Sequence, residues 1–234
     1  MRLKTITPLH LTEGELMRRQ ARFDRLAPPP LTIALANLPA DPEVPRSLDS
    51  DEACRASEAA VYREGLRTDP ADFDGILLDC VLDPALEALE RDAPVPVFGL
   101  LKLSATYLIS LGHKVAAVTR NRAIATEFEA RIESYRLENR FHSVEVLDLE
   151  FQDIADDTKW NATLQPVLGE LERYGVQALI NGCSAVDVQN RRDHIVVIDP
   201  TALALDLLAL AVNRKILSGT ETTRSATNNG KVPT

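Results

Sequence analysis

The chain has 234 residues, of which 45% are hydrophobic, so it can bury a full core as one large domain or two small ones. Its net charge of −9 argues against a nucleic-acid partner, because neutralising phosphates needs clustered lysine and arginine, and the sequence has no basic stripe. The 3 cysteines form no Cys-x-x-Cys pair and the 4 histidines show no ligand spacing, which excludes a disulfide framework and disfavours a zinc site.

No segment of the sequence predicts export or membrane insertion. The N-terminal segment MRLKTITPLHLTEGEL lacks the continuous apolar run of a signal peptide. No stretch approaches the roughly 18 apolar residues that a membrane span requires. We therefore expect a cytoplasmic protein with no membrane partner.

Strand and helix patterns alternate along the first half of the chain. In order, they predict a strand over 2–7, a helix over 13–26 with Thr12 as its N-cap, a strand over 31–38, a helix over 53–66, a strand over 75–79, a short helix that Asp83 caps, a strand over 95–99 and a helix over 100–112.

The second half repeats this order. It predicts strands over 115–119, 143–149, 178–182 and 195–199, and helices over 122–138, 163–175 and 201–212. Cys80 and Cys183 each follow the third strand of their half and stand 183 − 80 = 103 residues apart. The short strands after them begin at Val95 and Ile195, 195 − 95 = 100 residues apart. This match in order and spacing indicates a duplicated unit.

The expected fold is α/β, with two similar Rossmann-like lobes built on parallel sheets and related by a pseudo-twofold axis. Parallel α/β sheets bind ligands at the carboxyl ends of their strands, so we expect the active site in the cleft between the lobes. The first lobe would comprise residues 1–100 and 200–217, and the second residues 101–199. Residues 218–234, rich in Ser, Thr, Asn and Gly, are predicted to be a disordered tail.

Two of the cysteines lie where an apolar strand ends and a helix is expected to begin. The free N–H groups of a helix N-terminus favour a thiolate over a thiol, so Cys80 and Cys183 are candidate nucleophiles or bases. In a duplicated fold they would face one site from opposite sides. A single free cysteine at a strand end is more often a small core residue. Cys54, on a predicted helix between acidic and small residues, is expected to be a packing or surface residue. Asp79 is expected to have a structural or solvent-facing role.

Four segments at strand ends form a recognisable set of motifs. They are Cys80-Val81-Leu82-Asp83-Pro84-Ala85-Leu86, Gly182-Cys183-Ser184-Ala185, Ile6-Thr7-Pro8-Leu9 and Val118-Thr119-Arg120. In that order, they resemble Cys-Phe-Gly-Asp-Pro-Gly-Leu, Gly-Cys-Ala-Gly, Ile-Asn-Pro-Asn and Val-Thr-Thr of the aspartate/glutamate/hydantoin racemase superfamily, most closely its hydantoin racemase branch. Leu82 and Ala85 replace two glycines of the first motif.

The resemblance implies a cofactor-independent racemase or epimerase that acts on a carbon next to a carbonyl. Cys80 and Cys183 would be the catalytic acid/base pair, with no metal. The implied partners are a small-molecule substrate and further copies of the chain in a homo-oligomer. The substrate-binding residues would be Thr7, Pro8, Val81, Thr119, Arg120, Asn121, Ser184 and Ala185, with Thr7, Thr119 and Ser184 as candidate donors to an enolate oxygen.

Departures from the family pattern bear on the substrate. Amino-acid racemases of the superfamily usually have Thr-His or Thr-Glu after the second cysteine. Here Ser184 and Ala185 follow, which favours a more acidic, hydantoin-like carbon acid. Arg120 and Asn121 could recognise a carboxylate or a carbonyl, or form a plain strand-to-helix turn.

Other functions fit the same residues. A maleate-type cis–trans isomerase would use one cysteine to form a covalent adduct with the double bond. A decarboxylase of malonate-like acids would need only the second cysteine, so Cys80 argues against it. A non-catalytic small-molecule binder has no need of thiols on both faces of its ligand.

Overall fold

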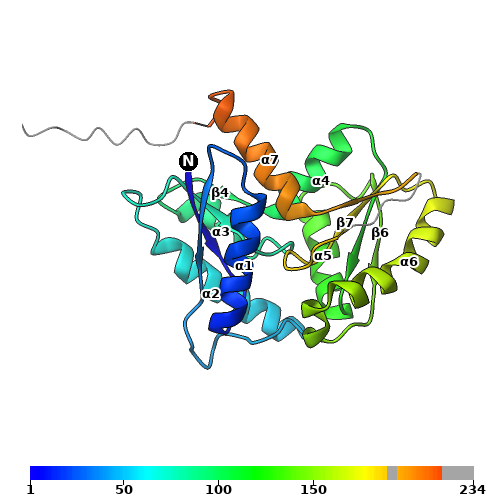
Figure 1. The fold of residues 1–234 in the computed structure, drawn as a ribbon, viewed down its shortest axis with the longest axis horizontal. Helices are drawn as coiled ribbons and strands as arrows, with labels where there is room; N and C mark the ends of the chain where they lie inside the picture. The colour runs from blue at the N-terminus through cyan, green and yellow to red at the C-terminus, as the bar shows by residue number, and fades with distance from the viewer. Residues whose placement is uncertain (189–193, 218–234) are drawn as a thin grey trace, which may run out of the picture.

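The computed structural model of the protein describes residues 1–188 and 194–217. The predicted tail, 218–234, lies outside the described residues. Two parallel four-stranded sheets lie side by side, one built from the N-terminal half and one from the C-terminal half (Figure 1). In the described part of the chain, no helix is long and apolar enough to cross a bilayer.

The two sheets have the same topology. The first has the order β2-β1-β3-β4 and the second the order β6-β5-β7-β8. The register repeats as well, because Leu3 pairs with Gly75 in the first sheet and Val115 with Ala178 in the second. The predicted pair of similar parallel α/β lobes is thus confirmed. The strands are β1 (Arg2–Ile6), β2 (Thr32–Ala36), β3 (Gly75–Leu78), β4 (Val97–Phe98), β5 (Val115–Thr119), β6 (Phe141–Val146), β7 (Ala178–Asn181) and β8 (Val196–Ile198).

Helices cover both faces of each sheet, because the central strands are apolar on both sides. Successive side chains of a strand point to opposite faces, so Leu77 packs in one core and its neighbours Ile76 and Leu78 pack in another. On the first sheet, one core includes α1 (Glu13–Leu26) and α7 (Pro200–Asn213), and the other α2 (Asp51–Leu66) and α3 (Leu86–Asp92). On the second sheet, α4 (Leu100–Ser110) and α5 (Arg122–Ser134) pack on one face and α6 (Asp157–Arg173) on the other.

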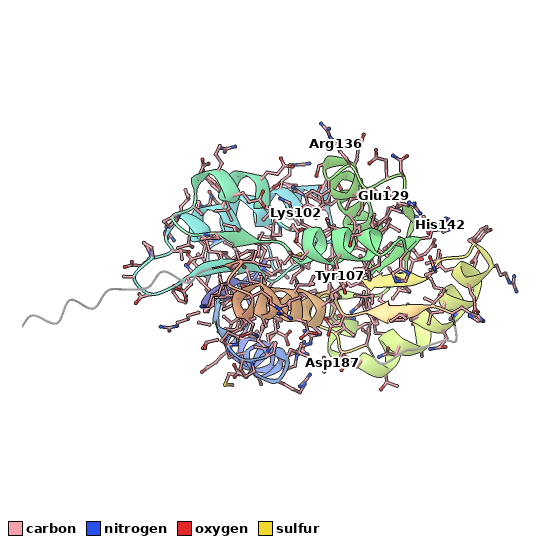
Figure 2. The ribbon with its side chains drawn as sticks, turned by 90° about the horizontal axis from the view of Figure 1, so that it is seen from above. Lys102, Tyr107, Glu129, Arg136, His142 and Asp187 are labelled. Atoms are coloured by element: carbon pink, nitrogen blue, oxygen red, sulfur yellow. The ribbon has the colours of Figure 1, made fainter. Side chains whose placement is uncertain are left out.

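Helices α4 and α7 connect the two lobes. They pack against each other at the centre of the molecule, where Figure 2 shows α4 with Lys102 and Tyr107 beside α7. Leu100 belongs to the core of the first lobe. The next residue, Leu101, and Ala105, one turn after it, belong to the core of the second. We propose the lobe division 1–100 with 200–217 and 101–199 on the basis of these two cores.

The sequence missed one element and misplaced the start of another. A 3-10 helix, η1 (Phe151–Ala155), follows β6 and was not predicted. Its signal is a reciprocal cap, in which Asp153 accepts the backbone N–H of Glu150 at 2.9 Å. Helix α6 starts at Asp157, six residues before its expected start, because Asp156 caps it and Trp160 in its first turn is fully buried.

Asp83 does not cap the helix that follows it, contrary to prediction. The chain turns through positive φ at Asp83 (44°) and Ala85 (59°) before α3 begins at Leu86. The Asp83 carboxylate instead accepts the backbone N–H groups of Leu101 (3.0 Å) and Lys102 (2.8 Å), and so caps α4. The loop after Cys80 is thereby tied to the helix that connects the lobes.

The buried Asp83 carboxyl gives a testable dependence of stability on pH. Burial raises its pKa to about 6, although the N–H groups of Lys102 and Leu101 and the hydroxyl of Tyr135 favour the ionised form. Because the folded-state pKa lies above the unfolded value near 4, the folded protein binds the proton more tightly, and stability falls as pH rises from about 4 to 7. Relative to Asp83→Asn, the wild type should lose about 2 kcal/mol of unfolding free energy over this range.

Urea unfolding of both proteins at pH 4.5 and pH 7 measures this change. The comparison with Asp83→Asn removes the contribution of every other titrating group. A difference between the two proteins that does not vary with pH would contradict the assignment.

Candidate active site

Cys80 and Cys183 line one cleft between the carboxyl ends of β3 and β7. The cleft is narrow, with a cavity volume of about 60 Å³. Its lining comes from both lobes and from η1 and is largely apolar. The lining residues are Pro8, Leu9, Arg19, Leu48, Asp79, Cys80, Val81, Leu82, Arg120, Ile124, Phe151, Ile154, Gly182, Cys183 and Ser184.

The loop after Cys80 forms a tight turn. The Cys80 carbonyl accepts the N–H of Asp83 at 3.1 Å, and the N–H of Leu82 hydrogen bonds to the thiol. The Cys80 side chain is 7% exposed.

The loop after Cys183 repeats this geometry 103 residues later. The Cys183 carbonyl accepts the N–H of Val186 at 3.5 Å, and the N–H of Ala185 hydrogen bonds to the thiol. The amide of Asn181 also donates to the Cys183 carbonyl at 2.9 Å and fixes the turn. Cys183 is half-buried.

Neither thiol lies at a helix N-terminus, which corrects the expectation from the sequence. Helix α3 begins six residues after Cys80, and residues 184–188 after Cys183 contain turns and no helix. A hydrogen bond from a single backbone N–H, two residues onward in each loop, takes the place of the expected helix terminus.

Gly182 allows the second loop to approach the neighbouring strand. Its N–H donates to the Val118 carbonyl at 2.7 Å, and a Cβ at this position would lie 2.2 Å from that oxygen. Only glycine fits there without moving the backbone, so the Gly-Cys pair of the motif has a steric reason.

Burial raises the pKa of both thiols, and nearby charges make the two pKa values differ. For Cys183, the Arg19 guanidinium acts against burial and lowers the pKa. For Cys80, the Asp79 and Asp83 carboxylates add to burial and raise the pKa further. Cys54, which packs in the core, has a pKa raised to about 11 by burial and stays a neutral thiol at neutral pH.

Arg19 and Asp79 form a buried ion pair at the cleft wall. Nη1 of Arg19 lies 2.9 Å from Oδ2 of Asp79, and Nε lies 3.0 Å from Oε1 of Glu15. Asp79 is therefore not solvent-facing, because it is buried in this ion pair at the cleft. Arg19 was not predicted from the sequence, in which its only local signal is the Glu15–Arg19 spacing of one helical turn.

Arg120 enters the cleft from the second lobe. Its Nη2 lies 2.5 Å from Oδ1 of Asp49, and its Nη1 donates to the Leu149 carbonyl at 3.3 Å. The guanidinium carbon lies 5.8 Å from the ring centroid of Phe151 in η1. Its Nε is buried and has no hydrogen-bond partner among the described residues.

The structure brings six of the ten predicted site residues to the cleft: Pro8, Cys80, Val81, Arg120, Cys183 and Ser184. The other four, Thr7, Thr119, Asn121 and Ala185, are not part of its lining. Asn121 caps α5 by accepting the N–H of Ile124 at 2.9 Å. Ser184 hydrogen bonds across the cleft to the Asp79 carbonyl at 3.1 Å.

Thr7 and Thr119 are equivalent in the two lobes and make equivalent contacts. The Thr7 hydroxyl lies 2.8 Å from the Leu9 carbonyl, and that of Thr119 lies 3.3 Å from the Asn121 carbonyl. Each hydroxyl therefore bonds to the backbone two residues onward and shapes the turn at its strand end.

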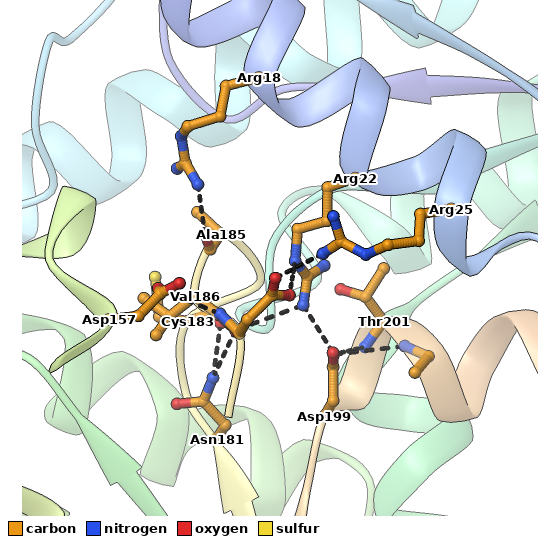
Figure 3. Close-up of polar contacts among 12 residues, drawn as sticks. Arg18, Arg22, Arg25, Asp157, Asn181, Cys183, Ala185, Val186, Asp199 and Thr201 are labelled. Atoms are coloured by element: carbon orange, nitrogen blue, oxygen red, sulfur yellow. Dashed lines mark hydrogen bonds and ion pairs between the residues drawn. The ribbon is translucent and has the colours of Figure 1, made fainter. Parts of the chain in front are cut away.

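Helix α1 of the first lobe holds the Cys183 loop of the second through a row of arginines (Figure 3). Arg18 donates to the Ala185 carbonyl at 3.2 Å and Arg22 to the Val186 carbonyl at 3.3 Å. Arg22 also pairs with Asp187 (2.8 Å) and with Asp199 (2.6 Å), the N-cap of α7.

Helix α5 of the second lobe holds the Cys80 loop in the corresponding way. Tyr135, just after α5, donates its hydroxyl to Asp83 at 2.9 Å. Arg131 pairs with Glu58 at 2.8 Å, and Glu58 accepts the N–H of Ala85 at 3.1 Å. Each cysteine loop is thus fixed by a helix of the opposite lobe.

Among residues 1–188 and 194–217, no group of three His, Cys, Asp or Glu side chains could hold a metal ion.

Comparison with known proteins adds a family to this geometry. Residues 15–208 match the family model described as Asp/Glu/Hydantoin racemase. Curated protein sequences give no match. Similar solved structures include an allantoin racemase from Pseudomonas fluorescens (TM-score 0.79, 18% identity, 100% of each chain covered). An allantoin racemase from Klebsiella pneumoniae has a TM-score of 0.75 and 19% identity over 100% of this chain and 96% of that one. A maleate isomerase from Pseudomonas putida S16 has a TM-score of 0.63 and 17% identity over 91% and 93%. At these identities, the structures show a shared fold.

The arginine row predicts unequal effects of two neighbouring substitutions. Arg22 is 4% exposed and Arg25 is 58% exposed, and both contact Asp187. Arg22→Gln leaves Asp199 without its cation and should lower the unfolding free energy by about 3 kcal/mol. Arg25→Gln, the matched control, should cost less than about 1 kcal/mol because its pair is exposed. Urea denaturation measures both, and equal effects would show that α1 does not fix the loop.

Proposed function

The chain belongs to the Asp/Glu/Hydantoin racemase family and is an isomerase, and from that premise we propose that Cys80 and Cys183 exchange protons with one substrate carbon. The carbon lies next to a carbonyl, and the reaction is a racemisation or epimerisation without a cofactor. The supporting observation is that two thiols in equivalent loops, 103 residues apart, line one cleft.

The proposed reaction inverts the carbon through an enolate. One cysteine, as thiolate, removes the proton from one face and becomes a thiol. The electron pair of the broken C–H bond moves into the carbonyl, which becomes the enolate. The other cysteine, as thiol, donates its proton to the opposite face and becomes the thiolate. Each acid or base step can supply on the order of 10²–10⁴ in rate.

The enolate oxygen needs hydrogen-bond donors that are already in place. Among the three hydroxyls considered from the sequence, only that of Ser184 lines the cleft, and its one O–H donates to the Asp79 carbonyl. The buried Nε of Arg120, which has no partner among the described residues, is the further donor that this geometry offers. We propose it as the group that binds a substrate carbonyl.

The charges and walls of the cleft favour a hydantoin-like substrate over a diacid. Both arginines already pair with carboxylates, Arg19 with Asp79 and Arg120 with Asp49, so little net positive charge remains for two substrate carboxylates. Most of the other lining is aliphatic or aromatic. We therefore propose that the substrate is a cyclic carbon acid with an apolar substituent. We also propose that the enzyme is cytoplasmic and acts as a homo-oligomer.

Substitution of either cysteine should abolish racemisation. Cys80→Ser and Cys183→Ser each remove one half of the acid/base pair and should reduce turnover of a 5-substituted hydantoin by about 10²-fold or more. Circular dichroism follows the loss of optical activity, and mass spectrometry follows solvent deuterium entering the stereocentre. Cys54→Ser is the matched control and should keep activity.

Three outcomes would contradict two-thiol proton transfer. Full activity in either single variant excludes it. A thioether adduct with maleate, trapped by mass spectrometry, would support cis–trans isomerisation instead. Binding of hydantoins, amino acids or small diacids without turnover of any would support a non-catalytic binder.

The rate should rise with pH across the neutral range. Burial raises the pKa of both thiols above the ordinary value near 8.5, so the thiolate base becomes more populated as pH increases. The rate should fall again only when the second thiol, which must act as the acid, also ionises. That decrease therefore lies at higher pH. We expect kcat/KM to increase from pH 6.5 to 9, after subtraction of the rate without enzyme. A maximum below pH 7 would be incompatible with a thiolate base.

A further inference from the structure

The two halves of the site differ in charge, although their backbone geometry is the same. Arg19 of α1 lines the cleft with Cys183, and Arg22 of α1 donates to the Val186 carbonyl in the Cys183 loop, so both guanidinium groups lower the pKa of Cys183 while Asp79 raises it. Cys80 stands in the chain between Asp79 and Asp83, whose carboxylates raise its pKa. Duplicated loops would otherwise give two equivalent thiols, so these side chains break the symmetry.

A crevice behind the Cys80 loop is lined by Cys54, Glu58, Glu127 and Arg131. The guanidinium of Arg131 pairs with both glutamates, at 2.8 Å from Glu58 and 2.9 Å from Glu127. Arg131 therefore lies on the far side of the loop and, unlike Arg19, does not line the cleft that holds both thiols.

Arg19 is held in a fixed position by two carboxylates. Its side chain is 6% exposed, its Nε lies 3.0 Å from Glu15 within α1, and its Nη1 lies 2.9 Å from Asp79 at the end of β3. Arg19 and Cys183 line the same cleft from opposite lobes. An opposite charge near a thiol in a poorly solvated site favours its thiolate strongly.

We propose that Cys183 is the first of the two thiols to ionise, with Arg19 as the positioning residue that stabilises its thiolate and Asp79 as the group that holds Arg19 in place. This assignment rests on the proposed function, in which one thiol must start as the base. Cys183 releases its proton to water, then takes the substrate proton, while Cys80 donates its own. Proton exchange with water restores the starting pair.

The assignment has a consequence for the two directions of a racemisation. Enantiomers have equal free energies, so kcat/KM must be the same in both directions whatever the protonation bias. A difference in ionisation between the two thiols can therefore change kcat and KM for each enantiomer, but not their ratio. The enantiomer whose proton faces Cys183 binds to the more populated form of the enzyme, in which Cys183 is the thiolate.

Alkylation of the free enzyme tests the order of ionisation without any substrate. Iodoacetamide reacts with thiolates, and Arg67 and Arg173 place the three cysteines on different tryptic peptides, so mass spectrometry follows each one separately. The maximum rate reflects access to the sulfur, whereas the pH midpoint reflects its ionisation. We expect the midpoint of Cys183 to lie below that of Cys80.

Arg19→Gln should raise the Cys183 midpoint by about one pH unit, which is a tenfold loss of thiolate at neutral pH, and should raise the Cys80 midpoint by less. Asp79→Asn keeps the guanidinium and should lower the Cys80 midpoint. Arg25→Gln is the matched control, because Arg25 is an exposed arginine of the same helix and does not line the cleft. It should move neither midpoint. A merely structural role for Arg19 would shift both cysteines alike.

A second variant keeps the proposal testable if Arg19→Gln does not fold. Arg19→Gln combined with Asp79→Asn leaves no unpaired buried charge, and it should bring the two midpoints together. A lower midpoint for Cys80 in the wild type, or unchanged midpoints in both Arg19 variants, would overturn the assignment. Failure of the proposed function is separate, because it would appear as activity retained in the single cysteine variants while the midpoints stand.

Discussion

The site depends on contacts in which a helix of each lobe holds the cysteine loop of the other lobe. Helix α1 of the first lobe holds the Cys183 loop of the second through Arg18 and Arg22. Helix α5 of the second lobe, with Tyr135 just after it, holds the Cys80 loop of the first. Each loop lies at the carboxyl end of a sheet and is also held by apolar packing, because Val81 and Leu82 belong to one core and Val186 to another. The contacts between the lobes add to this packing and hold the two loops on either side of the same cleft.

Duplication supplies two equivalent loops, and side-chain charge makes them different. A strict repeat would give two thiols with equal pKa values. Such a pair suits a reversible reaction on the two faces of one substrate carbon, but neither thiol would ionise before the other. Arg19 of α1 lines the cleft, whereas Arg131 of α5 pairs with Glu58 and Glu127 behind the Cys80 loop and does not line the cleft. The asymmetry therefore arises from two helices that occupy equivalent places in the fold and present different residues.

Local sequence predicted the regular elements well, because their signals are local. Helix α1 has its expected bounds and Thr12 as its cap, and the third strand of each half ends before its cysteine as expected. Long-range partners were the failures. Asp83 caps α4, 17 residues onward at Leu100, and not its own helix, since the chain between them turns through positive φ. The cleft residues Phe151 and Ile154 belong to η1, whose only local signal is the Glu150–Asp153 cap.

The sequence by itself determined the duplicated α/β fold, the membership in a racemase family and the position of both cysteines at strand ends. Those properties follow from hydrophobic periodicity and from motifs contiguous in the chain. Only the tertiary structure decided that Arg19 lies in the cleft with Cys183, that Asp79 is buried against it, and that Thr7, Thr119 and Asn121 serve turns and a helix cap. The reason is physical: these contacts join residues that are close in space only after the sheets have formed and the lobes have packed.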